Sequence, residues 1–114
     1  MDSKTRTYKF ALKVISLVDS LPNNVSALII GKQLLRAATS IGANVVEAQA
    51  SPSRRDFTNY FNHALKSANE TTYWLELLRE ANKGDMQIIN VLIKETREIA
   101  CILASSILTL KGKR

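Results

Sequence analysis

The chain has 114 residues and a mass of 12.7 kDa, which is enough for a single domain spanning residues 1–114 and too little for a second catalytic lobe. Hydrophobic residues make up 46% of it and charged residues 23%, with four Gly and two Pro, which is typical of a globular protein and excludes a disordered or low-complexity chain. A formal net charge of +6 suggests a polyanionic partner only where the positive charge is concentrated.

Apolar residues recur at steps of three and four along the chain, and no long stretch alternates with a period of two, so the sequence predicts an all-α fold. The first helix is expected from about Lys4 to Ser20, with Ser3 as its N-cap and the turn sequence after Leu21 ending it. Its predicted apolar stripe consists of Ala11, Val14, Ile15, Val18 and Leu21.

The second helix is expected to begin at Val25 or Ser26 and to end at Gln49 or Ala50, because the residue before Pro52 is pushed out of the helical region. Its core stripe is predicted to be Ile30, Leu34, Ala37, Ala38, Ile41, Val45 and Ala48. Small residues occupy one flank of this stripe, and glycine inside a helix suggests that another helix backbone approaches closely. The small residues are Ala27, Gly31, Ala38 and Gly42.

Ser53, with Asp56 three residues later, predicts the N-cap of a third helix that ends near Asn82, where Gly84 would act as the C-cap residue. A fourth helix is expected from about Asp85. Both helices have apolar seams that alternate steps of three and four: Phe57, Phe61, Ala64, Ala68, Thr71, Leu75 and Leu78, then Ile89, Leu92, Thr96, Ile99, Leu103, Ser106 and Leu110. Because short loops keep consecutive helices together, we predict an elongated, antiparallel up-down-up-down four-helix bundle.

The longest nearly uninterrupted apolar stretch, residues 99–110, is shorter than the roughly 20 residues that a bilayer span needs. Residues 1–10 carry charge without an apolar signal-peptide core. We therefore expect a cytoplasmic protein without a membrane partner. Cys101 stands alone in an apolar stretch, which favours a buried thiol.

The third and fourth helices carry more apolar residues than one bundle stripe requires, and the second half of the fourth helix has hardly any polar face. Since each helix of a four-helix bundle keeps an outer face, this surplus predicts a homo-oligomer; scattered surface hydrophobes are the alternative. The predicted interface includes Tyr60, Trp74, Ile93 and Ala100.

Four polar residues follow one another along one side of the second helix at steps of four, four and three. They are Arg36, Ser40, Asn44 and Glu47. We predict a semi-buried, hydrogen-bonded structural row in which Arg36 and Glu47 pair with groups on neighbouring helices or subunits, and a solvated helix face is the alternative.

The segment from Gln33 to Glu47 resembles the QLxRAAxSIxxNIxEG signature of the 23S ribosomal RNA intervening-sequence proteins, and departs from it at Ala48, where that family has glycine. Residues downstream are similar to the family's third helix: Arg54, Arg55, Phe57, Phe61, Ala64, Ser67, Glu70 and Leu75. The resemblance implies a bacterial four-helix bundle that assembles as a homopentamer. It also implies kinship with the nucleic-acid-binding accessory proteins of diversity-generating retroelements, whose protein client is a reverse transcriptase.

Positive charge is concentrated at the two chain ends, since residues 1–13 hold four basic residues against one acidic residue and residues 111–114 hold three basic residues. In the predicted bundle both chain ends lie at the same pole as the loop between the second and third helices. Because the first helix is the shortest, its basic residues can lie below the tip of that pole. The opposite pole is expected to be near neutral. The predicted nucleic-acid-binding residues are Lys4, Arg6, Arg54, Arg55, Lys111, Lys113 and Arg114.

No group of residues specifies a reaction. His63, the only histidine, has no evident orienting carboxylate nearby in the sequence, which favours a buried or interfacial imidazole over a catalytic one. One histidine cannot complete a di-iron site, and zinc-ligand spacing and glycine-rich phosphate loops are absent, so neither a metal nor a cofactor is predicted. Ribonucleases of the HEPN type have four to six residues between an arginine and their histidine, whereas seven residues lie between Arg55 and His63. We predict that the protein is not an enzyme.

Two classes of function remain. The first, which we favour, is an oligomer that binds nucleic acid through its basic pole, as an accessory to an RNA-processing or reverse-transcriptase machinery. The second is a structural or protein-binding oligomer whose basic ends are incidental. No aromatic residues interleave a basic face, so nucleic acid would be bound through its backbone phosphates with little sequence preference.

Overall fold

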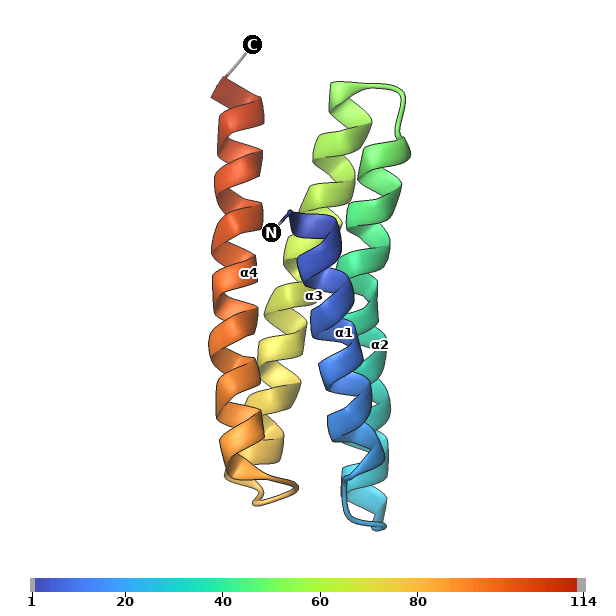
Figure 1. The fold of residues 1–114 in the computed structure, drawn as a ribbon, viewed down its shortest axis with the longest axis vertical. Helices are drawn as coiled ribbons and strands as arrows, with labels where there is room; N and C mark the ends of the chain where they lie inside the picture. The colour runs from blue at the N-terminus through green and yellow to red at the C-terminus, as the bar shows by residue number, and fades with distance from the viewer. Residues whose placement is uncertain (1, 113–114) are drawn as a thin grey trace.

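Four helices make up the computed structural model, which describes residues 2–112 (Figure 1). Their bounds are α1 Ser3–Asp19, α2 Val25–Ala50, α3 Arg54–Glu80 and α4 Met86–Gly112. No strand occurs in this part of the chain, so the all-α prediction is confirmed for it. None of the described helices combines the length and apolar character that crossing a membrane requires.

Asp2, and not Ser3 as predicted, caps the N-terminus of α1. The backbone N–H of Thr5 donates a hydrogen bond of 2.7 Å to the Asp2 carboxylate, and this bond holds the pKa of Asp2 below its ordinary value. Both residue types can cap a helix, and here Ser3 already lies within the first turn. The predicted apolar stripe of α1 was also wrong in part, because Ile15 is exposed. The residues that α1 buries are Thr7, Phe10, Val14 and Leu17.

The predicted bounds of α2 are confirmed. Asn24 caps its start by accepting a hydrogen bond of 3.0 Å from the Ala27 N–H, and Ser51, the residue before Pro52, is extended as expected. The helix continues through Ala48, the position at which the sequence departs from the resembled signature, and Ala48 is fully buried.

Ser53 caps α3 as predicted, accepting a hydrogen bond of 3.1 Å from the Asp56 N–H. The helix ends at Glu80, close to the predicted end near Asn82. The prediction of Gly84 as the C-cap residue was wrong, because Asn82 takes the left-handed position, with φ 56°. The Lys83 N–H then bonds the Leu78 carbonyl at 2.9 Å, which closes a Schellman-type cap around Asn82. Gly84, at φ 94°, belongs to the following loop.

The close approach predicted along the small-residue flank of α2 is confirmed, and the neighbour is α1. A Cβ atom added at Gly42 would lie 3.2 Å from the Thr7 Oγ1. One at Gly31 would lie 3.5 Å from the Val18 side chain of α1 and 3.1 Å from that of Leu21, just beyond the end of α1. Glycine at these two positions lets α1 pack directly on the backbone of α2.

The bundle is a rod of 49 × 21 × 20 Å, elongated as predicted. The chain turns back after each helix, and α1 packs against α2, α2 against α3, α3 against α4 and α4 against α1 (Figure 1). Because α1 is the shortest helix, its start lies well below the pole formed by the α2–α3 loop and the end of α4 (Figure 1). Near that pole the bundle therefore consists of three helices.

Candidate nucleic-acid interface

Two consecutive helices, α3 and α4, place cationic side chains from their distant ends around one hollow at this pole. Arg54 and Arg55 come from the first turn of α3, directly after its Ser53 cap, and Lys111 comes from the last turn of α4. The hollow has a volume of about 420 Å³. We call it the basic hollow, and it is lined by Arg54, Arg55, Thr58, Asn59, Leu110 and Lys111.

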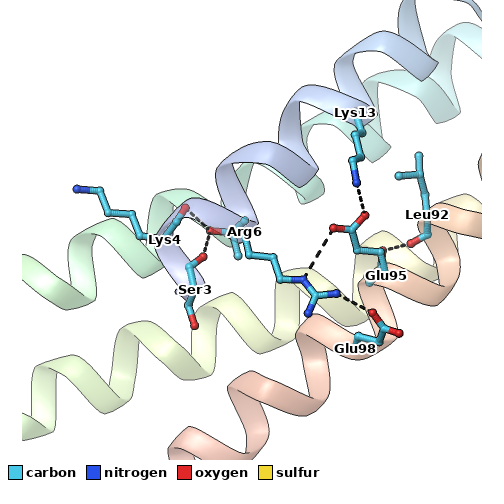
Figure 2. A network of polar contacts seen from close by, with 9 residues as sticks. Ser3, Lys4, Arg6, Lys13, Leu92, Glu95 and Glu98 are labelled. Carbon is cyan, nitrogen blue, oxygen red and sulfur yellow. Dashed lines mark hydrogen bonds and ion pairs between the residues drawn. The ribbon is translucent and has the colours of Figure 1, made fainter. Parts of the chain in front are cut away.

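The structure does not bring Arg6 into the basic hollow. Its guanidinium contacts Glu98 at 2.7 Å and Glu95 at 3.9 Å, and the Lys13 ammonium contacts Glu95 at 3.0 Å (Figure 2). These ion pairs join α1 to α4, and those of Arg6 neutralise a charge that was predicted to meet nucleic acid. Lys4 is exposed and its side chain points away from this network (Figure 2). The two remaining predicted cations, Lys113 and Arg114, lie outside the described residues.

The predicted polar row divides into a bonded centre and two free ends. The Asn44 amide donates to the Ser40 carbonyl at 2.8 Å and to the Ser40 hydroxyl at 3.1 Å, and the Ser67 hydroxyl of α3 donates to the same Ser40 oxygen at 3.0 Å. Ser40 therefore ties α2 to α3, and the bonds of Asn44 stay within α2. The side chains of Arg36 and Glu47 are exposed, and within residues 2–112 neither side chain has a hydrogen-bond or ion-pair partner, so the pairing predicted with neighbouring helices is not found.

Since Arg36 is exposed, the Arg36→Ala variant is expected to change the free energy of unfolding of the chain by less than about 0.5 kcal/mol. By contrast, Ser40→Ala removes the shared partner of Asn44 and Ser67 and is expected to cost about 1–2 kcal/mol. Urea denaturation followed by circular dichroism measures both. An equal loss of free energy of unfolding in the two variants would show that the Arg36 side chain has a partner outside the single chain.

His63 is exposed in the single chain, so of the two expectations for it, a buried or an interfacial imidazole, the buried one is wrong. It shares a polar hollow of about 460 Å³ near the α2–α3 loop with Glu47, Asp56 and Tyr60. This grouping could not be inferred from the sequence, because Glu47 comes from another helix. No cluster of His, Cys, Asp and Glu that could hold a metal ion occurs among the residues described.

The predicted oligomer interface is only partly accessible. Ile93 is 3% exposed and belongs to the chain's own core, so its assignment to an outer face was wrong. Tyr60, Trp74 and Ala100 are half-buried against that core. Other apolar side chains are more exposed, including Tyr73, Val91, Ile102 and Leu108. Cys101 is also exposed, and the prediction of a buried thiol was wrong.

The comparisons with known proteins agree with the resemblance seen in the sequence. A model of the family described as 23S rRNA-intervening sequence protein matches residues 1–105. The chain belongs to this family. Among solved structures, this family member is similar to a protein of unknown function from Bacteroides thetaiotaomicron, described as belonging to the S23 ribosomal protein family. The two share 40% sequence identity over 93% of this chain and 98% of the other, with a TM-score of 0.86. No match is found among functionally curated proteins.

Proposed function

We propose that this 23S rRNA-intervening sequence family member binds the phosphate backbone of RNA or DNA at its basic hollow and performs no catalysis. The observation that carries the proposal is the convergence of Arg54, Arg55 and Lys111 on one hollow, from helix ends more than 50 residues apart in the sequence. Arginine and lysine are the side chains that most often neutralise nucleic-acid phosphates.

The other lining residues of the basic hollow support the binding of phosphates without recognition of the base sequence and without catalysis. Asn59 supplies an amide donor suited to a phosphate oxygen, whereas the Thr58 hydroxyl already donates to the Arg54 carbonyl at 2.9 Å. The lining includes no aromatic ring on which a base could stack and no carboxylate or imidazole that could transfer a proton. The expected contacts are therefore with phosphates, and sequence preference is expected to be weak.

The proposal includes cytoplasmic assembly into a homo-oligomer, with the pentamer that the family resemblance implies. Exposed apolar side chains on α3 and α4 support it, and Leu108 is the most exposed of those on α4, at 71%. An assembly with aligned poles would present several basic hollows to one polyanion and raise its avidity. The same resemblance suggests a client in an RNA-processing or reverse-transcriptase machinery.

Light scattering at micromolar concentration is expected to return about five times the chain mass of 12.7 kDa. Leu108→Glu is expected to lower this mass, because an unpaired charge buried in an interface is costly, while the fold survives since Leu108 is exposed in the single chain. Circular dichroism checks the fold of the variant. A single-chain mass for the unmodified protein would contradict the oligomer.

Binding titrations against duplex and single-stranded RNA and DNA, each at two salt concentrations, test the function. Affinity is expected to fall with salt by about 0.7–0.9 logarithmic units per logarithmic unit of salt for each phosphate contacted, and to vary little with sequence. If none of the four nucleic acids binds, the alternative of a structural or protein-binding oligomer is correct.

A further inference from the structure

The fourth corner of the bundle is open near the basic hollow, because α1 begins too far from the pole to fill it (Figure 1). The first turn of α1 meets α4 at Ile99, Ile102 and Leu103, which together with Ser3 and Thr7 line a small cavity. Beyond Leu103, α4 continues to Gly112 without α1 beside it. The side of α4 that would face α1 therefore lies uncovered over its last turns.

A groove occupies this open corner, with a volume of about 550 Å³. Phe57 and Phe61 of α3, stacked with their ring centroids 4.6 Å apart, contribute its aromatic lining. The Ser106 hydroxyl donates to the Ile102 carbonyl at 3.0 Å, so this polar group is satisfied within the helix. We call this the corner groove, and its lining is Phe57, Phe61, Cys101, Ile102, Ser105, Ser106, Thr109 and Leu110.

The apolar seams of α3 and α4 become partly exposed at the corner groove. Phe61 and Leu103 are buried, whereas the seam positions nearer the pole, Phe57, Ser106 and Leu110, are only half-buried. The apolar seam thus continues about two turns beyond the start of α1, which is the helix that covers it elsewhere.

The charged residues at the rim of the corner groove indicate the chemistry of the molecule that binds in it. Leu110 lines both the corner groove and the basic hollow, so the groove opens directly beside Arg55 and Lys111. Both are exposed, and neither has an ion-pair partner within residues 2–112. At the other end of the groove Glu98 is already engaged by Arg6. An occupant must therefore present apolar side chains along the groove and negative charge at the pole.

We propose that the corner groove binds an amphipathic helix of a partner protein, with acidic residues at the end that lies beside Arg55 and Lys111. The groove follows residues 101–110 of α4, a rise of about 14 Å, which accommodates two to three turns of helix with apolar residues at i, i+3 or i+4, and i+7. A second copy of this chain fits less well, because both of its ends carry net positive charge. The acidic end of the helix would share Arg55 and Lys111 with the phosphate contacts of the proposed function, whereas the apolar lining of the corner groove takes no part in those contacts except at Leu110.

A labelled synthetic 14-residue helical peptide, with leucines at i, i+4 and i+7 and two glutamates at one end, is the probe. Fluorescence anisotropy is expected to show saturable binding to the full chain, weakened about tenfold in Ile102→Gln because a large part of one apolar contact is lost. Val91→Gln is the matched control, since Val91 is an exposed apolar residue of the same helix that does not line the groove, and its affinity is expected to change less than twofold. Replacing the glutamates of the peptide by lysines is expected to abolish most of the binding.

Three results would overturn the proposal. They are absence of binding by the acidic peptide, equal affinities for Ile102→Gln and Val91→Gln, and a fall in the light-scattering mass of Ile102→Gln that would identify a second copy as the occupant. Nucleic-acid affinity is expected to be unchanged in Ile102→Gln. A failure of the peptide experiment is therefore distinguishable from a failure of phosphate binding.

Discussion

Replacing Arg54, Arg55 and Lys111 together by glutamine is expected to weaken binding to RNA and DNA about 10²-fold at 0.1 M salt. The size of this loss of affinity follows from counterion release, because each lost phosphate contact removes about 0.7–0.9 from the slope of log K against log salt. Three contacts therefore remove about two to three units of slope. The loss is expected to be the same for all sequences, and titrations at several salt concentrations measure both quantities.

The matched control removes the same charge elsewhere. Lys32, Lys66 and Lys94 are exposed, and none of them lines the basic hollow. Their joint replacement by glutamine is expected to change affinity several-fold at most, through the long-range field alone. Equal losses in the two triple variants would show that net charge, and not the basic hollow, determines binding.

Phe10→Ala is expected to lower the free energy of unfolding by about 3–5 kcal/mol, a large part of the stability of a domain of this size. Phe10 is fully buried and belongs to α1, the shortest helix, so its ring anchors that helix in the core. Leu12→Ala in the same helix is the control, because Leu12 is 50% exposed, and a loss below about 0.5–1 kcal/mol is expected.

Urea denaturation at one fixed protein concentration measures both variants, since assembly makes apparent stability depend on concentration. The fluorescence of Trp74, the only tryptophan, reports unfolding at a site on α3, a helix that α1 does not contact directly. Similar losses for the two variants would show that α1 is not packed as described.

Helix boundaries were predictable wherever the signal is local. Ser53 satisfies an N–H three residues away, and Pro52 constrains the backbone of the residue before it, so both can be inferred from neighbouring residues alone. Asp2 and Ser3 are equally good caps by type, and only the folded geometry chose between them. Asn82 took the left-handed position expected of glycine, because the Schellman bonds close there and not at Gly84.

The site was less predictable, because its geometry depends on how far each helix reaches. The sequence placed Arg54, Arg55 and Lys111 at one pole, and the structure brings them together around one hollow. It did not reveal that Arg6 is neutralised by Glu98, a residue 92 positions away. The exposure of Cys101 could not be inferred either, since it depends on which side of α4 other helices cover.

The shortness of α1 also divides the rod into two regions of unequal local stability. Between Leu103 and Gly112, α4 rests on α3 alone, so few buried contacts oppose the opening of its backbone hydrogen bonds. Amide protons there should exchange with solvent through local opening, at a lower free-energy cost than those around Leu34 in the fully buried core. One side of the basic hollow, formed by the capped first turn of α3, is thus fixed, and the other side, carrying Lys111, can adjust to the phosphate it meets.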